Sequence, residues 1–430
     1  MHRYSFQHRN FFKPKYYIHI IMTDNNGFLR LKWARDHMPV CANIRERFLK
    51  EKPFKGIKIA MALHVEAKTG IFALLLTEGG AEVRLASCNP LSSDDSVVQS
   101  LSKDYNYMVY AKKGESEKEY YENINKTIEA APDIIIDDGG DLTNLVASKP
   151  ELVKKVIGGN EETTTGVVRL KAMEKAGALK FPMFDVNDAQ MKHFFDNRYG
   201  SGQSALDGFM NATNILIAGK NALVAGYGYV GKGVAMRLKG MGARVTVTEV
   251  DPVKAIEAVM DGFTVDTMNS AIRYCDLIFT ATGMKNVVSY DDMLVAKKGI
   301  IMGNVGHFNN EIDYSSLEKK NIGKTPVRNL VTEYKLENGN TVNLISDGRL
   351  LNLAAGQGHP VEIMDLSFAL QALTAEYIVK NKGKLSNKVY PVPAEIDTEV
   401  AKIALESLNF KIDTYTEEQL KYLDSYQEGT

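Results

Sequence analysis

The stretch that decides the fold runs from residue 221 to residue 249 and reads NALVAGYGYVGKGVAMRLKGMGARVTVTE. A strand of small and branched residues leads into three glycines, Gly226, Gly228 and Gly231, at GxGxxG spacing. The first glycine permits a tight turn, the second lets the backbone approach a pyrophosphate, and the third lets helix and strand pack closely. The helix that follows ends at Gly242 and places its positive N-terminal end beside the phosphates. This pattern predicts a dinucleotide-binding βαβ unit.

The strand after this helix ends on an acidic residue, Glu249. A carboxylate at that distance accepts the ribose hydroxyls of a dinucleotide and repels a 2′-phosphate, so NAD is favoured over NADP. A GxGxxG motif alone is weak evidence, and a glycine-rich turn in another doubly wound domain is the alternative. The flanking strands and the acid together indicate NAD as the cofactor.

Strands and helices alternate in two separate series along the chain. The first series begins with IKIAMAL (57–63) and continues through AEVRLAS (81–87) to PDIIIDD (132–138). The second starts at residue 220 and continues through DLIFTATG (276–283) and GIIMGNVGH (299–307). Strands that alternate with crossover helices imply parallel pairing. We therefore expect an α/β fold with two doubly wound parallel-sheet (Rossmann-like) domains, a cleft between them and a C-terminal tail.

The composition limits the classes of partner. The 430 residues include 52 Lys and Arg against 53 Asp and Glu, a formal net charge of -1. This balance offers no basic surplus to nucleic acid or anionic lipid, and no apolar run approaches the roughly 20 residues of a membrane helix. The three separated cysteines suit a reducing cytoplasm and suggest neither disulfides nor a metal site. Residues 1–21 make a poor signal peptide, and we interpret them as an extension without function.

Polar residues follow several strands of the first series. His64 ends one strand, Asn89 follows the next, and Asp137 and Asp138 end a later one. Ligands of open parallel sheets bind beyond the carboxyl ends of the strands. Taken singly, these residues also fit a structural histidine and a turn before two glycines. Their shared position at strand ends favours a functional site for a small-molecule substrate.

Four further segments carry candidate side chains. EETTTG (161–166) combines two carboxylates with three hydroxyls, a pattern that also suits a helix cap. Lys192 and Asp196 lie at i, i+4 spacing, which is also the commonest spacing of surface ion pairs. His307 ends a strand of the second series, and NLAAGQGHP (352–360) reads as a glycine-rich linker back to the first domain.

Taken in order, these motifs give the chain a strong resemblance to the S-adenosylhomocysteine hydrolases. The matching stretches begin at about residue 30 and are LHVEAKT, SCNPLSSDD, DDGGDLTNL, EETTTGV, FDNRYG, AGYGYVGKG, TEVDP, NVGHF and GRLLNLAAGQGHP. The resemblance implies a homotetramer whose chains each have a substrate domain and an NAD domain joined by two hinges. The expected boundaries are 22–197 with 360–392 for the substrate domain, 198–359 for the NAD domain and 393–430 for a tail or oligomerisation arm.

The resemblance also implies a reaction, the reversible hydrolysis of the thioether of S-adenosyl-L-homocysteine to L-homocysteine and adenosine. Oxidation at C3′ by NAD acidifies the C4′ hydrogen, homocysteine is eliminated, water adds, and the hydride returns. A 2-hydroxyacid dehydrogenase would share the NAD unit but would release NADH. A non-catalytic NAD-binding regulator would be expected to lack Asp138 or Lys192, and both are present.

By the same resemblance, residues receive expected roles. Lys192, with a lowered pKa, and Asp196 would handle the 3′-hydroxyl proton, and Asp138 would act at C4′ and C5′ with His64 near the leaving sulfur. The expected catalytic residues are Asp138, Lys192, Asp196, His64 and His307. The expected substrate-binding residues are His64, Glu66, Lys68, Thr69, Asp138, Glu162, Lys192, Asp196, His359 and Met364. The expected NAD-binding residues are Thr163, Thr164, Thr165, Asn197, Gly226, Gly228, Tyr229, Val230, Gly231, Glu249, Thr282, Gly283, Val305, Gly306, His307 and Asn352.

The chain departs from the family's usual pattern at Glu66 and Lys68, where the family carries Thr and Glu. That family glutamate accepts a hydrogen bond from the 6-amino group of adenine. Lys68 is a donor and suits the 6-oxo group of hypoxanthine, while Glu66 could accept from its N1–H. S-inosyl-L-homocysteine is therefore an alternative substrate. In the other interpretation the two residues pair with each other and the backbone reads adenine.

The C-terminus is a second departure. The chain stops at KYLDSYQEGT, without the longer Lys- and Tyr-bearing tail that many family members lend to a neighbour's NAD. Lys421 and Tyr422 could partly substitute for that tail. The affinity for NAD and its rate of exchange are the properties that this departure affects.

Overall fold

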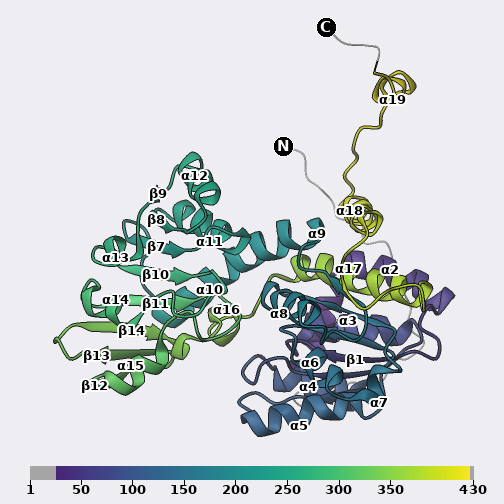
Figure 1. Ribbon diagram of the computed structural model, residues 1–430, viewed down its shortest axis with the longest axis horizontal. Helices are drawn as coiled ribbons and strands as arrows, with labels where there is room; N and C mark the ends of the chain where they lie inside the picture. Colours follow the sequence, from purple (N-terminus) through teal and green to yellow (C-terminus); the bar gives the residue numbers. More distant parts are fainter. Residues whose placement is uncertain (1–25, 427–430) are drawn as a thin grey trace.

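The computed structural model describes residues 26–426, and the predicted extension at residues 1–21 lies outside them. The strands form two sheets, each in its own lobe of the molecule (Figure 1). The chain leaves the first lobe through α9 (Gln190–Lys192), the π-helix His193–Gly200 and α10 (Ser201–Thr213). It returns through α16 (Leu351–Ala354) into the long helix α17 (Val361–Lys380). The second lobe is therefore inserted between two parts of the first.

The first sheet is parallel throughout, with strand order β15-β6-β5-β4-β1-β2-β3. Its strands are β1 (Lys58–Ala62), β2 (Glu82–Ala86), β3 (Met108–Tyr110), β4 (Ile134–Asp137), β5 (Gly158–Glu161), β6 (Met183–Asp185) and β15 (Val389–Pro391). The edge strand β15 comes from beyond the inserted lobe and pairs with β6. The four residues of β4 are fully buried, as expected for a strand covered on both faces.

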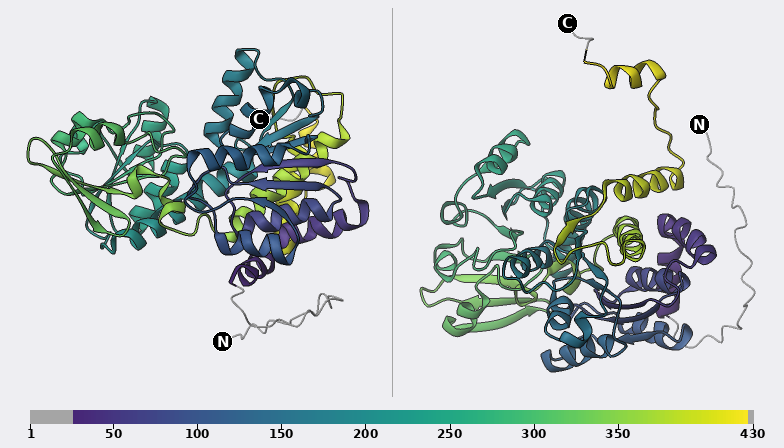
Figure 2. Two further views of the ribbon diagram at one scale, coloured as in Figure 1. Left: turned by 90° about the horizontal axis from the view of Figure 1, so that it is seen from below. Right: turned by 45° about the vertical axis from the view of Figure 1, so that its right-hand side comes forward.

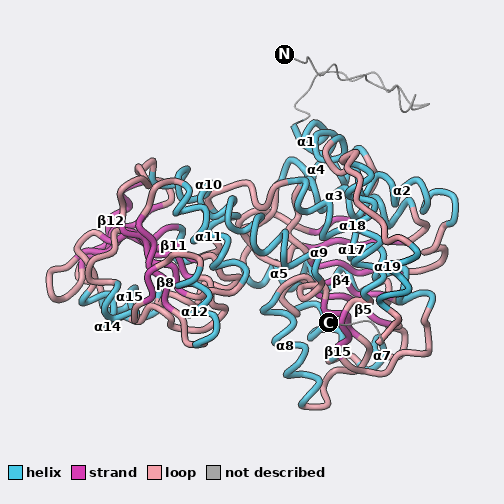
Figure 3. The backbone as a smooth tube through the Cα atoms, turned by 90° about the horizontal axis from the view of Figure 1, so that it is seen from above, coloured by secondary structure: helices cyan, strands magenta, loops and turns pink. Residues whose placement is uncertain are grey.

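Helices cover both faces of this sheet (Figure 3). One buried apolar cluster contains side chains of α1 (Asn26–Asp36), α2 (Pro39–Glu51), α3 (Ala67–Glu78), α4 (Asp95–Asp104), α17 and α18 (Ala394–Ser407). The cluster on the other face contains side chains of α5 (Glu117–Ile128), α6 (Asp141–Ala147), α7 (Pro150–Val153) and α8 (Thr164–Lys175). This two-sided packing is the doubly wound arrangement expected from the sequence.

The second sheet has the order β12-β13-β14-β11-β10-β7-β8-β9. Its strands are β7 (Asn221–Ala225), β8 (Arg244–Thr248), β9 (Thr264–Val265), β10 (Leu277–Thr280), β11 (Ile300–Asn304), β12 (Gly323–Arg328), β13 (Val331–Lys335) and β14 (Thr341–Ile345). All pairs from β14 to β9 are parallel, whereas β13 runs antiparallel to both of its neighbours. Sequence analysis did not predict this antiparallel extension, because the largely exposed β12 has no alternation of buried and exposed residues.

Two apolar clusters flank the second sheet as well. Side chains of α10, α11 (Tyr229–Gly240), α12 (Pro252–Met260) and α16 fill one face. Those of α13 (Met268–Ala271), α14 (Tyr290–Val295) and α15 (Tyr314–Lys320) fill the other. The second lobe is therefore also a doubly wound α/β unit. Within residues 26–426, none of the helices combines the length and apolar character that a membrane span requires.

The C-terminal region has one part that packs on the first lobe and one part that is exposed. Helix α18 buries Ile396 and Val400 against the first lobe. After it, the chain extends away from the lobes and ends in α19 (Glu417–Leu423), as Figure 2 shows. Every residue from 408 to 426 is exposed. We call residues 408–426 the C-terminal arm.

Candidate active site

A cavity of about 1210 Å³ lies between the two lobes and is lined by both. The first lobe contributes residues that follow β1, β4, β5 and β6, among them His64, Asp138 and Glu162. The second lobe contributes residues that follow β7, β8, β10 and β11, including Gly226 and Glu249. The carboxyl ends of both parallel sheets thus face one space, as the rule for ligands of open sheets predicts.

The glycine-rich loop after β7 has the geometry that its sequence predicts. Gly226 has a φ of +95°, and a Cβ there would lie 2.7 Å from the carbonyl oxygen of Ala281. A Cβ on Gly231 would lie 2.0 Å from the carbonyl oxygen of Gly226, so only glycine lets α11 pack this close to the strand. Gly228 has no atom within 4 Å of its Cβ position and lines the cavity. The loop therefore leaves room for a ligand at the N-terminus of α11.

Glu249 closes the loop from the next strand. Its carboxylate accepts hydrogen bonds from the backbone N–H groups of Tyr227 at 2.7 Å and Val250 at 2.8 Å. It lines the cavity beyond the glycines, where a carboxylate can accept from ribose hydroxyls. Residues 349–360 lead the chain back to the first lobe, and we call them the return segment. Within it, Asn352 has a buried side-chain oxygen without a partner among the described residues. Open glycines, a carboxylate and this unpaired acceptor fit an NAD molecule.

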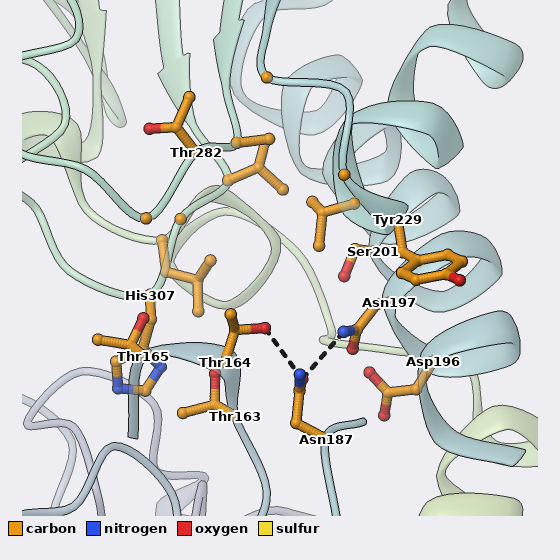
Figure 4. A pocket seen from close by; sticks show the side chains of 18 of the residues that line it. Thr163, Thr164, Thr165, Asn187, Asp196, Asn197, Ser201, Tyr229, Thr282 and His307 are labelled. Carbon is orange, nitrogen blue, oxygen red and sulfur yellow. Dashed lines mark hydrogen bonds between the residues drawn. The ribbon is translucent and has the colours of Figure 1, made fainter. Parts of the chain in front are cut away.

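Hydrogen-bonded polar side chains line one part of the cavity, and Figure 4 shows Thr164, Asn187 and Asn197 among them. Lys192 Nζ donates to Asn197 Oδ1 at 2.7 Å, and Asn197 Nδ2 donates to Asn187 Oδ1 at 3.0 Å. Thr164 Oγ1 donates to the same Asn187 oxygen at 3.0 Å. Sequence analysis missed Asn187, although it follows β6 in the same way that His64 follows β1. Its amide fixes the orientation of the cavity-lining Asn197 and Thr164.

Lys192 lies in a buried cluster of charges. Its Nζ is 3.3 Å from Glu162 Oε1 and 3.3 Å from Asp196 Oδ1, and all three residues are buried. Burial lowers the pKa of Lys192, but the charges of Asp196 and Glu162 outweigh burial and raise it overall. The expectation of a lowered pKa is therefore wrong in this structure, because Glu162 adds a second carboxylate to the predicted pair.

The two carboxylates beside Lys192 differ from each other. Burial raises the pKa of Glu162 to about 8, although Lys192 opposes this, and Gln371 Nε2 donates to Glu162 Oε2. Burial also acts to raise the pKa of Asp196, but Lys192 and His359 hold it well below its usual range. Near neutral pH, the cluster therefore contains a charged Lys192 and Asp196 beside a protonated Glu162.

Asp196 also contacts the return segment of the chain. His359 Nδ1 lies 3.1 Å from Asp196 Oδ1, and its Nε2 lies 3.1 Å from the hydroxyl oxygen of Ser201. Ser367 Oγ donates to the second oxygen of Asp196 at 2.9 Å. A proton taken up at Asp196 therefore has a neighbouring imidazole to which it can pass.

Asp138 lies between two histidines from different lobes. His64 Nε2 is 3.3 Å from Asp138 Oδ2, and His307 Nδ1 is 3.7 Å from Asp138 Oδ1. Burial lowers the pKa of His64 to about 4, despite the opposing charge of Asp138. At neutral pH the His64 ring is therefore uncharged and can accept or donate one proton. Its Nδ1 is held at 2.7 Å by Ser92 Oγ.

Glu66 and Lys68 form the pair that one interpretation of the sequence describes. Lys68 Nζ lies 3.1 Å from Glu66 Oε2 and also donates to the carbonyl oxygens of Gln357 at 3.2 Å and His359 at 2.9 Å. An ammonium has three donors, and all three are engaged here. Glu66 lines the cavity, whereas Lys68 lies behind its wall, under residues 357–359.

Two residues that sequence analysis did not single out hold the loops of the second lobe. The Asn304 amide N–H₂ donates to three carbonyl oxygens, those of Gly306, Phe308 and Gly348. The buried Glu311 carboxylate accepts from the backbone N–H groups of Thr282 and Gly283. These contacts place the loop of His307 beside Asp138. In the sequence, their only signal was a hydrogen-bonding side chain, Asn304, at the end of β11.

Nearly all of the sequence-predicted site residues meet in this cavity. Its lining includes His64, Glu66, Thr69, Asp138, Glu162, Thr163, Thr164, Thr165, Lys192, Asp196, Asn197, Gly226, Gly228, Tyr229, Val230, Glu249, Thr282, Gly283, Val305, Gly306, His307, Asn352, His359 and Met364. Lys68 and Gly231 lie behind the lining, in the positions described above. Leu350, Leu353 and Phe368 line it in addition.

A protein in which a dinucleotide loop and a buried set of ionisable side chains share one interdomain cavity has the architecture of an NAD-dependent enzyme. Comparison with family models identifies the particular class. Residues 15–152 match the model described as S-adenosyl-L-homocysteine hydrolase, and residues 197–358 match the model of its NAD binding domain. The chain belongs to the S-adenosyl-L-homocysteine hydrolase family, and it is a hydrolase that uses NAD.

Individual relatives agree with this assignment. Adenosylhomocysteinase from Thermoplasma volcanium is 69% identical over 410 residues, which cover 95% of this chain and 100% of the relative. The protein of the same name from Thermoplasma acidophilum is 68% identical with the same coverage. The S-inosyl-L-homocysteine hydrolase of Methanocaldococcus jannaschii is 54% identical and covers 94% of this chain and 97% of its own length. The predicted family and cofactor are thereby confirmed, and both purines occur among the names of relatives.

Proposed function

We propose that this chain catalyses the reversible hydrolysis of the thioether of an S-nucleosyl-L-homocysteine, with S-adenosyl-L-homocysteine as the first candidate substrate. The observation that carries the proposal is that the Lys192–Asp196 pair and the Asp138–His64 pair line the same cavity as the dinucleotide loop. Bound NAD supplies reversible oxidation of the ribose at C3′. A substrate of this kind is a product of methyl transfer, so its removal belongs to the methyl cycle.

Lys192, Asp196 and Glu162 suit the ribose hydroxyls. The protonated Glu162 and the Lys192 ammonium are donors that hold the oxygens, and the ionised Asp196 accepts a proton from the 3′-hydroxyl. His359, 3.1 Å from Asp196, gives that proton a route away from the ribose. Lys192 then stabilises negative charge on the oxygen rather than acting as the base.

Asp138 and His64 suit the bond that breaks. Asp138 is the carboxylate that removes the C4′ proton once C3′ has been oxidised. The uncharged His64, whose pKa is about 4, lies 3.3 Å from Asp138 and can exchange a proton with it. His64 therefore protonates the leaving sulfur and later receives the proton of the water that adds at C5′. His307 closes this end of the cavity from the second lobe.

S-inosyl-L-homocysteine is a second candidate, and one observation favours it. The Lys68 ammonium occupies the carbonyl oxygens of Gln357 and His359, which would otherwise be acceptors for a 6-amino group. Lys68 lies behind the cavity wall with its three donors engaged, so it acts only through its positive charge, which attracts a 6-oxo group and disfavours an amino group. The Glu66 carboxylate, on the cavity wall, accepts from the N1–H of hypoxanthine or from the amino group of adenine.

Kinetics on purified enzyme with the two thioethers side by side, measured as free thiol, test both candidates. If Lys68 disfavours adenine, Lys68→Met should shift the ratio of kcat/KM values toward the adenosyl compound by about 10-fold or more. A ratio that does not change in Lys68→Met would show that Lys68 does not select the purine, and the ratio measured on the wild type would then decide between the two thioethers. Stoichiometric accumulation of NADH during turnover would contradict hydrolysis itself and indicate a dehydrogenase.

We also propose a cytoplasmic homotetramer in which the C-terminal arm packs on a neighbouring chain. The arm exposes apolar side chains that its own chain does not cover: Leu408, Phe410, Ile412, Tyr415, Leu420, Tyr422, Leu423 and Tyr426. Such a cluster marks an interaction surface. Sedimentation of the full chain should give a tetramer, and a chain ending at residue 407 should give a smaller species that retains NAD less well. The unpaired cysteines at 41, 88 and 275 support a reducing compartment.

A further inference from the structure

Two buried carboxyl groups lie directly behind Asp138 and Glu162. β4 ends at Asp137 and β5 ends at Glu161, and these two residues are register partners in the first sheet. The next residues along the chain, Asp138 and Glu162, line the cavity. Asp137 and Glu161 are fully buried and are not among its lining residues. Successive side chains of an extended chain point to opposite faces, so this second pair lies beneath the cavity wall.

One oxygen of Glu161 holds both loops that carry the cavity-lining carboxyl groups. Glu161 Oε1 accepts hydrogen bonds from the backbone N–H of Gly139 at 2.8 Å and from that of Thr163 at 3.0 Å. Gly139 directly follows Asp138 in the chain, and Thr163 directly follows Glu162. The position of Asp138 relative to Glu162 is therefore set through one shared acceptor atom.

The fold keeps the Glu161 carboxyl group in an unfavourable place. A Cβ on Gly166 would lie 2.1 Å from Glu161 Oε1, so only glycine in the first turn of α8 leaves room for it. Glu161 Oε2 is buried and has no hydrogen-bond partner within residues 26–426. Burial and the charges of Asp137 and Asp138 raise the pKa of Glu161 well above its usual value. An apolar side chain would avoid this cost, which indicates that the contacts of Oε1 serve the site.

The backbone of Gly139 is also held at its carbonyl group. Arg169 Nη1 donates to the carbonyl oxygen of Gly139, and the same atom donates to Asp141 Oδ1 at 2.8 Å. Gly139 has a φ of +108°, and a Cβ there would lie 2.7 Å from His307 Nε2. The turn after Asp138 must therefore keep one backbone conformation for His307 of the second lobe to fit beside it.

We propose that Glu161 and Arg169 are positioning residues for the reaction, and we call their contacts with the backbone of Gly139 the Gly139 clamp. The clamp holds Asp138 at C4′ of the ribose, and Glu161 extends the constraint to Glu162 at the ribose hydroxyls. C3′ and C4′ are adjacent atoms, so the two groups must keep a fixed separation while the ring is oxidised and deprotonated. This inference rests on the proposed function and adds residues that act without touching the substrate.

Two partial reactions of the holoenzyme with a purine nucleoside test the clamp. Reduction of bound NAD reports on the ribose hydroxyls, and exchange of the C4′ hydrogen with deuterium oxide reports on Asp138. Glu161→Leu should slow both by about 10²-fold, whereas Glu161→Gln keeps the carbonyl acceptor and should stay close to the wild type. Arg169→Met should slow only the exchange, by about 10-fold, because Glu161 still holds the loop, and Arg169→Lys should recover part of that loss.

Glu115→Leu is the matched control, because Glu115 is another buried acid of the first lobe with an unpartnered oxygen within residues 26–426, and it does not line the cavity. It should lose stability in urea but keep both rates.

Rates in Glu161→Leu no lower than those in Glu115→Leu would overturn this inference and leave the proposed function intact. A Glu161→Gln as slow as Glu161→Leu would also overturn it, because the carboxyl group would then act through its proton and not as an acceptor. If Glu161→Leu does not fold, the partly exposed Arg169 decides, and normal C4′ exchange in Arg169→Met overturns the clamp. Failure of every purine nucleoside to reduce bound NAD in the wild type would instead overturn the proposed function, and this inference with it.

Discussion

The two walls of the cavity are built on different principles. The first lobe presents buried ionisable side chains, including Asp138, Lys192 and Asp196. Against the effect of burial, the two aspartates raise the pKa of Lys192, and Lys192 in turn lowers the pKa of Asp196. The second lobe presents largely backbone and small residues, with Gly226 and Gly228 at its centre. The first wall is suited to moving protons and the second to holding a large ligand close to a helix terminus. We call the wall of the first lobe the reacting wall and that of the second lobe the retaining wall. Substitutions that change catalysis without changing NAD content, or the reverse, test this division.

Loss of the Asp138 carboxylate should give the largest effect. Asp138→Asn should lower kcat for hydrolysis by about 10²- to 10⁴-fold, because a general base is removed. NAD content should remain normal, since Asp138 belongs to the reacting wall. Bound NAD should still be reduced by nucleoside alone, as the carboxylate acts after that step. Loss of NAD from this variant would contradict the division between the walls.

Asp196→Asn should interrupt the reaction earlier. Without the carboxylate 3.3 Å from Lys192 and 3.1 Å from His359, the 3′-hydroxyl loses its proton acceptor. Reduction of bound NAD by nucleoside should slow by on the order of 10²-fold, as measured by NADH absorbance in a single turnover. If elimination slowed while NAD reduction stayed fast, the roles of Asp196 and Asp138 would have to be exchanged.

On the retaining wall, Gly231→Ala should reduce NAD content rather than chemistry. The new methyl would meet the Gly226 carbonyl oxygen at 2.0 Å and push α11 away from β7. Overpacking of this kind costs about 1–3 kcal/mol, so NAD should bind roughly 10-fold more weakly. Gly240→Ala, in the same helix but with no atom within 4 Å of its Cβ, is the matched control and should keep its NAD.

The last expected effect concerns stability at the reacting wall and leaves catalysis aside. Burial raises the pKa of Glu162 from 4.5 to about 8, so the fold favours its uncharged form. Its contribution to the free energy of unfolding is complete below pH 4.5 and declines as pH rises through about 8. Between pH 4.5 and about 8, the free energy of unfolding measured with urea should therefore fall less in Glu162→Gln than in the wild type. An unchanged pH slope would show that Glu162 titrates normally.

The fold and much of the site follow from local patterns. Strand ends located His64, Asp138 and His307, and glycine spacing located the loop after β7, because both depend on residues close together in the chain. The i, i+4 spacing of Lys192 and Asp196 also predicted their ion pair correctly, although residues 193–200 form a π-helix. Such features are readable because backbone geometry fixes them before any tertiary contact forms.

Other features depend on contacts between distant segments. The pKa of Lys192 is raised by Glu162, which arrives from another strand, and the donors of Lys68 are used by carbonyl groups at 357 and 359. Asn187 and Arg169 gained significance only when their neighbours were known. A sequence pattern gives no distance between such segments, so neither the protonation of the cluster nor the Gly139 clamp could be predicted.

The edge strand β15 has a consequence for how the protein is made. Its partner β6 ends at Asp185, but β15 begins only at Val389, after the whole inserted lobe. During synthesis on the ribosome, the inserted lobe emerges complete while the first sheet still lacks its last strand and the covering helix α17. The retaining half can therefore mature first, and the reacting half is finished by the last segments of the chain to be translated.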